Sequence, residues 1–453
     1  MASTPQTTGC TLQLLHHFNC FRRLDQITSL RFGLTRMRSI STAGFVTAFA
    51  LTLLALPAFA EKQEQPKKNS VTARVQAAAK APARDGDAEA RLIGIYKLIG
   101  MANTREALAK AEDLVRDNPN FQLAQLVYGD LLAAQLKPIR ALGDVPDAAA
   151  KAAAPLLAEL RQESRLRLKA LTARPPADMI PSQFLSLSAM NKHAIAIDAA
   201  KSRLYLFENT ATGMKLLADY YISIGKSGIE KAAEGDLRTP LGVYFITSNL
   251  NPKSLKGFYG SGALPVNYPN QLDVKRGKTG GGIWLHGTPP SQFSRAPQAT
   301  DGCVVLANPD LERIIRTVEI RTTPVVIAQS LRWVAPQNIK ADSKPFTDAL
   351  DGWQAAKSSG DVSRVASWYA ADFTSNGKTL AEWTAALRIE MNKHAGKSIQ
   401  LKDVSYLRWT DANDTMVVTF GELIQGAKTG SIKRQYWGRN GNQWKIFYEG
   451  IIG

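Results

Sequence analysis

The chain has 453 residues, with 56 Lys and Arg against 39 Asp and Glu, so its formal net charge is +17. This length exceeds one typical domain, and we expect two or three. The charge indicates an anionic partner, but the chain lacks the clustered basic and aromatic residues that bind single-stranded nucleic acid. After residues 1–60, three His and one Cys remain without ligand-type spacing, which argues against a zinc site, so we expect no metal and no cofactor.

A secretory leader is predicted at residues 1–60. Residues 37–60 read "MRSISTAGFVTAFALTLLALPAFA", with a basic start, an apolar run and a small-x-small end. This pattern is typical of a signal peptide cleaved after Ala60 and predicts a periplasmic protein; a membrane anchor or a first core helix is the alternative. Cys10 and Cys20 would leave with the leader. An exported chain meets nucleic acid rarely, so glycan strands, peptide carboxylates or anionic lipid are the expected anions.

The next two segments differ in composition. Residues 61–84 are rich in Lys, Ala, Gln and Pro and predict a flexible linker. Residues 85–172 are rich in Ala and Leu at helical spacing, with a break at Asn118-Pro119. This helical region resembles a tetratricopeptide unit and could bind a partner. Such units need neighbours, so a plain helical spacer remains the alternative.

Residues 186–330 predict a strand-rich central domain. Short apolar runs bounded by turn residues predict strands at 193–198, 202–208, 217–225 and 321–334. The segment "NPDLERIIRTVEI" predicts one helix, for which Asn308 is the expected cap and Pro309 the first residue. The expected inner face of that helix consists of Leu311, Ile314, Ile315 and Val318.

One thiol, Cys303, remains after the leader. In "ATDGCVVLAN" it follows a turn and precedes a β-branched run. A single Cys in an exported protein indicates a reactive or intermolecular thiol, whereas a buried, inert Cys is the alternative. A thiol nucleophile needs a base. In "GGGIWLHGT", His286 ends an apolar strand beside Gly, which favours it as that base.

These motifs resemble a known family. "HGT", a loop and "TDGCVVLAN" are similar to the signature of the YkuD-type L,D-transpeptidases, and "EGDLRTPLGVYFIT" at 234–247 resembles the conserved stretch upstream of their active site. The resemblance covers about residues 186–330. It implies a mostly-β catalytic domain that joins peptidoglycan stem peptides through a cysteine thioester, in cell wall biogenesis and cell shape.

The resemblance also implies roles for single residues. Cys303 matches the nucleophile and His286 the general base, whose ring the carbonyl of Gly287 would orient. The N–H groups of Gly302 and Cys303 match the oxyanion hole, and Thr300 matches the Ser or Thr of the motif. We expect a His286 imidazolium to lower the pKa of the Cys303 thiol.

Two positions depart from the family pattern. Asp301 replaces a second His, and its carboxylate should favour the thiol over the thiolate. Val305 replaces a common Arg that could meet a substrate carboxylate. The candidates for binding the substrate in its place are Arg238, Thr239 and Arg295, with Lys278 as a further cation.

Residues 345–453 predict a separate α+β domain. Helices come first, and three strands follow at 398–409, 415–426 and 431–450. The order resembles the cone-shaped SnoaL-like fold of the nuclear transport factor family. No acid–base pair is evident, so we expect a binding or dimerising domain whose Trp residues belong to the core.

Three functions remain open from the sequence. The first is a peptidoglycan L,D-transpeptidase. The second is an L,D-carboxypeptidase, or a hydrolase that releases attached groups, because Asp301 and Val305 alter the region where an acceptor would approach. The third is a non-catalytic peptidoglycan-binding scaffold, because most of the mature chain lies outside the matching segment.

Overall fold

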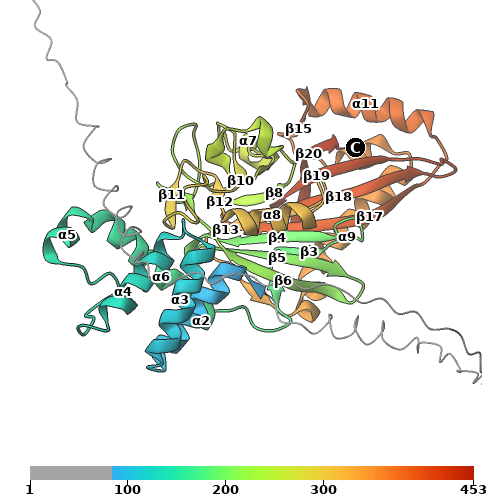
Figure 1. The fold of residues 1–453 in the computed structure, drawn as a ribbon. Coiled ribbons are helices and arrows are strands. Elements are labelled where there is room, and N and C mark those ends of the chain that lie inside the picture. The colour runs from blue at the N-terminus through green and yellow to red at the C-terminus, as the bar shows by residue number, and fades with distance from the viewer. Residues whose placement is uncertain (1–83, 453) are drawn as a thin grey trace, which may run out of the picture. The chain divides into compact units, whose positions relative to one another are not determined.

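A computed structural model describes residues 84–452 (Figure 1). The predicted leader and all but the last residue of the predicted linker lie outside the described residues. The described part consists of a helical region, a mostly-β central domain and a C-terminal α+β domain, which confirms the fold class expected from the sequence. None of its helices is long and apolar enough to cross a membrane.

The helical region packs around small and apolar side chains. Its helices are α2 (Asp87–Gly100), α3 (Thr104–Asp117), α4 (Gln122–Ala133), α5 (Asp147–Ala152) and α6 (Ala154–Thr172). Ala107, Ala111 and Leu114 lie on the buried face of α3, at the spacing that the sequence predicts. The helix ends just before Asn118-Pro119, since the residue preceding a proline is disfavoured in helical conformation.

The main sheet of the central domain has six strands in the order β1-β6-β5-β4-β13-β8. Its strands are β1 (Arg84–Asp85), β4 (His193–Asp198), β5 (Arg203–Thr210), β6 (Gly213–Tyr221), β8 (Gly242–Phe245) and β13 (Pro324–Ala328). Alternate residues of a strand point to opposite faces, so β4 contributes to two cores. Ile195 and Ile197 face the core of the central domain, whereas Ala194 and Ala196 join the core shared with the C-terminal domain.

Smaller sheets lie beside the main sheet and carry the site described below. They are formed by β9 (Ala263–Pro265), β10 (Trp284–His286) and β12 (Val304–Val305), and by β7 (Ile224–Gly225) with β11 (Gln298–Thr300). The remaining elements here are η2 (Ala199–Lys201), η3 (Pro252–Ser254), η4 (Gly257–Tyr259), α7 (Gln271–Lys275) and α8 (Asn308–Thr317).

Helix α8 confirms the predicted helix after the thiol, but the predicted cap is wrong. Ala307 takes the N-cap position and makes no side-chain hydrogen bond there, while Asn308 is already helical. Leu311 and Ile314 are fully buried, as the predicted inner face requires. The Asn308 amide instead binds two loops of the central domain, which no local sequence pattern shows.

The C-terminal domain packs helices against an antiparallel sheet. Its elements are α9 (Pro336–Ser358), α10 (Val362–Ala366), β15 (Thr374–Ser375), β16 (Lys378–Thr379), α11 (Leu380–Lys393), β17 (Ile399–Thr410), β18 (Asp414–Ile424), β19 (Ser431–Asn440) and β20 (Gln443–Ile451). The prediction of three final strands is wrong, because the segment 431–450 turns back on itself. Gly441, with φ of +58°, supplies the left-handed conformation of the two-residue turn between β19 and β20.

Helix α9 also starts earlier than the domain boundary expected at residue 345. Pro345 lies inside the helix and not before it. A proline in a helix removes one backbone hydrogen bond. Burial on either side offsets that loss, because Ile339, Phe346 and Trp353 all insert into one apolar core.

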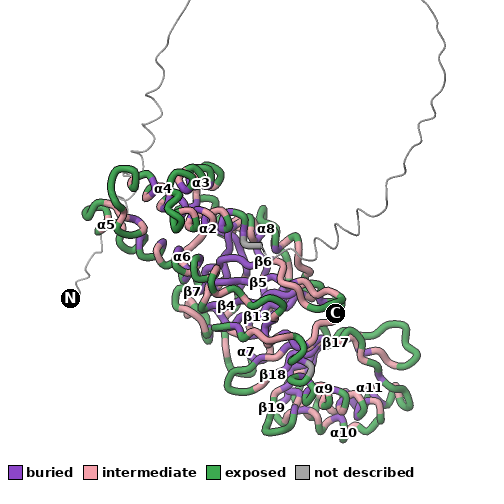
Figure 2. The backbone as a smooth tube through the Cα atoms, turned by 90° about the horizontal axis from the view of Figure 1, so that it is seen from below, coloured by how far each residue is buried: buried purple, intermediate pink, exposed green. Residues whose placement is uncertain are grey.

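The C-terminal sheet incorporates a strand from well before it in the sequence. Its order is β20-β19-β18-β17-β3, and β3 (Phe184–Ser186) pairs antiparallel with β17. A second antiparallel pair joins β2 (Ile180–Pro181) to β14 (Trp333–Val334), and its apolar side chains belong to the same core as those of β3 and β17. Figure 2 shows that buried backbone gathers along β4, β5 and β6 and again along β18.

Candidate functional site

Two adjacent parallel strands hold the candidate base and nucleophile. His286 is the last residue of β10 and lies opposite Val305 of β12, whereas Cys303 directly precedes β12. Leu285, the central residue of β10, is fully buried in the core of the central domain and anchors the strand there. By this register Cys303 falls opposite Trp284, so the thiol and His286 lie on neighbouring strands, two residues apart along them and on the same face of the sheet.

Burial and one hydrogen bond set the state of His286. The ring is buried, and Nδ1 lies 2.7 Å from the carbonyl oxygen of Gly287. Because that oxygen can only accept, Nδ1 carries the proton and Nε2 keeps its lone pair. Burial lowers the pKa of His286 to about 4, although the hydrogen bond to Gly287 opposes this. His286 is thus a neutral imidazole at pH 7, able to accept a proton.

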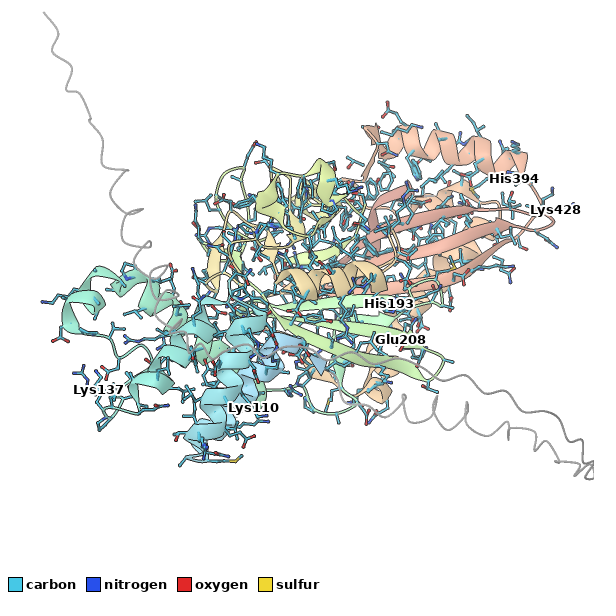
Figure 3. The ribbon with its side chains drawn as sticks, in the orientation of Figure 1. Lys110, Lys137, His193, Glu208, His394 and Lys428 are labelled. Carbon is cyan, nitrogen blue, oxygen red and sulfur yellow. The ribbon has the colours of Figure 1, made fainter. Side chains whose placement is uncertain are left out.

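The other histidines of the described residues have different surroundings (Figure 3). The Nδ1 atom of His193 lies 3.0 Å from a carboxylate oxygen of Glu319. His394 follows the last turn of α11 in the C-terminal domain. Neither is a neighbour of the thiol in the chain or in its sheet, which favours His286 as the base.

The thiol of Cys303 is half-buried and donates to the carbonyl oxygen of Gly282 at 3.3 Å. Burial raises the pKa of Cys303 above its ordinary value, and the Asp301 carboxylate raises it further. A backbone hydrogen bond from Trp284 and the nearby Arg295 lower it by less. The expectation of a thiol with a lowered pKa is therefore wrong for the resting site, because a neutral imidazole cannot stabilise a thiolate as an imidazolium would.

Two hydrogen bonds of Thr300 and the close packing of Gly302 fix the turn that carries Cys303. Thr300 Oγ1 donates to the carbonyl of Cys303 at 2.7 Å and accepts from the N–H of Gly302 at 3.1 Å. Gly302 has φ of +123°, and a Cβ there would lie 2.7 Å from the carbonyl oxygen of Arg238. Glycine is therefore required at this position. Because the Gly302 N–H is already bound at rest, its predicted part in an oxyanion hole stays a prediction.

Thr239 holds the same turn through hydrogen bonds from its buried side, so the predicted role of Thr239 in substrate binding is wrong. Its side chain is fully buried, its hydroxyl donates to the carbonyl of Gly302 at 2.9 Å, and it accepts from the N–H of Gly225 at 2.9 Å. Because this hydroxyl is fully buried and already donates and accepts inside the protein, it is not accessible to a substrate.

Asp301 and Val305, the two residues that depart from the family pattern, differ in their exposure to solvent. Asp301 is exposed and forms an ion pair with Lys226, at 2.9 Å between Nζ and Oδ1. Such exposed pairs contribute little to stability. Val305 is buried and pairs with Ser223 through backbone hydrogen bonds, so no polar group replaces the arginine at that position.

Of the candidate cations, Arg295 has surroundings suited to an anion. Its guanidinium lies 4.3 Å from the ring centroid of Phe258, and its charge affects the pKa of both Cys303 and His286. Its buried Nε has no hydrogen-bond partner among the described residues. Arg238 donates to the carbonyl of Ile229. Lys278, similarly, forms an ion pair with Asp273.

Asn308 belongs to the support of the site, although the sequence indicated only a helix cap. Its Oδ1 accepts from the N–H groups of Ser261 and Thr288, at 3.0 and 3.1 Å, and its Nδ2 donates to the Thr288 carbonyl. A Cβ at Gly287 would lie 2.0 Å from this Oδ1. Glycine after the histidine therefore makes room for the amide that joins the two loops.

Metal chemistry has no candidate set of ligands here. Within residues 84–452, no three His, Cys, Asp or Glu side chains gather in a way that could hold a metal ion. The groups available at the site are a thiol, an imidazole, a guanidinium and backbone amides. Together they suit acyl transfer through a thioester.

A solved structure shares the fold over part of the chain. One match is Bd1075 of Bdellovibrio bacteriovorus, with a TM-score of 0.52 and 24% identity, over 60% of this chain and 98% of that one. Another is Pgp2 of Campylobacter jejuni, titled a helical cell shape determining protein, with a TM-score of 0.49 and 23% identity, over 60% of this chain and 95% of that one. A comparison with curated protein sequences finds no match.

Family models match two segments. Residues 192–327 match the L,D-transpeptidase catalytic domain of the YkuD type, and residues 345–450 match the Cds6 C-terminal NTF2-like domain. Both resemblances expected from the sequence are thereby confirmed. The chain therefore combines a YkuD-family L,D-transpeptidase catalytic domain with a C-terminal NTF2-like domain.

Proposed function

We propose that this protein is a periplasmic peptidoglycan L,D-transpeptidase with Cys303 as nucleophile and His286 as general base. The observation that carries the proposal is a pair of adjacent parallel strands inside the segment that matches the family. His286 is the last residue of one strand, and Cys303 directly precedes the other. Export rests on the signal-peptide pattern at residues 37–60.

The Cys303 thiol and the His286 imidazole are both neutral at rest, so the reaction begins with transfer of the thiol proton. The thiol first breaks its hydrogen bond to Gly282, and His286 Nε2 takes the proton as the sulfur attacks the carbonyl carbon of a stem peptide. The C–N bond to the terminal D-residue then breaks, and the imidazolium returns the proton to the departing amine. An acceptor amine attacks the thioester and releases Cys303, while His286 again takes and returns the proton.

Burial leaves the base unprotonated, although it also makes His286 a weaker base for a thiol whose pKa is raised. With its pKa lowered to about 4, His286 is unprotonated over the neutral range and is always ready to act as base. The imidazolium and thiolate arise together during attack, so each stabilises the other only when charge develops. Arg295 is a cation near the sulfur that is available to meet a substrate carboxylate.

The test is acylation of the mature protein by muropeptides with tetrapeptide stems. We expect an acyl adduct on Cys303 by mass spectrometry, absent from Cys303→Ala, and strongly reduced in His286→Gln. Cross-linked dimers or exchanged D-amino acids among the products support transfer. Tripeptides alone support an L,D-carboxypeptidase, and binding of muropeptides without adduct or product supports a non-catalytic scaffold.

A further inference from the structure

The loop between the two candidate catalytic residues is bound by the helical region. We name residues 288–297 the site loop. Phe293 in this loop stacks on Phe121, with ring centroids 4.2 Å apart, and is buried in the core of the helical region. Its N–H donates to the carbonyl of Asn120 at 3.0 Å, and the Asn120 side chain donates to the carbonyl of Pro290 at 3.0 Å.

A buried ionic network forms the second attachment. Ser294 Oγ donates to Glu163 of α6 at 2.8 Å, and Arg167 donates two hydrogen bonds to the same carboxylate oxygen. The Arg167 guanidinium lies 3.9 Å from the ring centroid of Tyr221, whose hydroxyl donates to the carbonyl of Arg295 at 2.9 Å. Glu163 and Arg167 are only 3% and 2% exposed, so the network is shielded from solvent.

Both attachments lie immediately beside Arg295. Residues 293 and 294 are held by side-chain contacts with the helical region, and the carbonyl of residue 295 is held through Tyr221. A shift in any of these contacts moves the backbone from which the Arg295 side chain extends. The guanidinium in turn lies over Phe258, whose ring centroid is 5.9 Å from that of His286.

We propose that the helical region is a positioning element of the active site: Phe121 and Glu163 hold the site loop so that Arg295 presents its cation beside Cys303. The ligand for this cation is a carboxylate of the peptide substrate, a detail that rests on the proposed function. Position 305 is Val where the family commonly has Arg. The helical region, which lies outside the segment that matches the family, thereby holds another cation, Arg295, at the site.

Alkylation of Cys303 tests the positioning without any substrate. Iodoacetate is anionic and iodoacetamide is neutral, so the ratio of their rates reports the cation near the sulfur. In the full mature protein we expect Arg295→Gln to lower this ratio about fivefold, as expected for one charge at a partly exposed site. Ser294→Ala and Phe121→Ala should lower it in the same direction, and Phe121→Leu should restore most of it.

Tyr96→Phe is the matched control. It removes a hydrogen bond to Ser164 inside the helical region, at 2.8 Å, without touching the site loop, and should leave the ratio unchanged. If Arg295→Gln lowers the ratio while Ser294→Ala and a folded Phe121→Ala do not, the helical region does not position Arg295 and the proposal is wrong. An unchanged ratio in Arg295→Gln also overturns it.

A kinetic comparison links the same contacts to the substrate. For stem peptides with a free terminal carboxylate, we expect Ser294→Ala to raise KM more than it lowers kcat. For the matching peptide amides this difference should vanish. A general loss of stability would affect both substrates equally, which would count against positioning. If no muropeptide is turned over, the proposed function fails, and the alkylation ratio still decides the positioning role.

Discussion

Thr239→Val is the sharpest test of how the nucleophile turn is held. Valine has nearly the shape of threonine but lacks the hydroxyl that joins the carbonyl of Gly302 to the N–H of Gly225. Both backbone groups lie in buried residues, and each would lose its partner. An unsatisfied buried group costs about 1–3 kcal/mol, so we expect the loss of both partners to lower the free energy of unfolding by about 2–6 kcal/mol.

The matched variant is Thr239→Ser, which keeps the hydroxyl and removes one methyl group, at a cost of about 1 kcal/mol. Urea unfolding followed by circular dichroism measures both variants, and acylation of Cys303 is measured where each remains folded. Valine should slow acylation, because Gly302 is then free to shift, whereas serine should not. If valine lies within about 0.5 kcal/mol of wild type, or if the two variants are equally destabilised, the hydroxyl does not hold this turn.

The remaining predictions concern the thiol, the base and their supports. Because burial raises the pKa of Cys303, iodoacetamide should react with it more slowly at pH 6.5 than with a free thiol; a faster reaction would contradict this. The folded pKa of His286 is about 4 against 6.5 for the ordinary group, so protonation favours unfolding. Stability should therefore fall by about 3 kcal/mol as the pH drops from 6.5 to 4, and His286→Gln should remove that part of the titration. Gly302→Ala should reduce acylation about a hundredfold, since the Cβ would meet the carbonyl of Arg238; normal activity would show that the turn can adapt. Asn308→Ala should lower both stability and acylation because three hydrogen bonds are lost, whereas a mere helix cap would leave acylation unchanged.

Local patterns in the sequence determined the order of the domains and the candidate chemistry. A turn followed by β-branched residues marks the position of Cys303, and Gly after an apolar strand marks His286, because both signals arise within a few residues. The helix after the thiol was predictable for the same reason, since its apolar spacing is written in consecutive turns. The strand pair β19–β20 was predictable in principle from its two-residue Gly441-Asn442 turn.

Contacts between distant residues were decided only by the tertiary structure. Thr239 meets Gly302, and the helical region meets the site loop, across long stretches of chain that carry no common pattern. The raised pKa of the thiol has the same origin, because burial depends on what the whole domain places around the sulfur. Sequence therefore identified which groups could react, whereas packing determined their charge and what holds them in place.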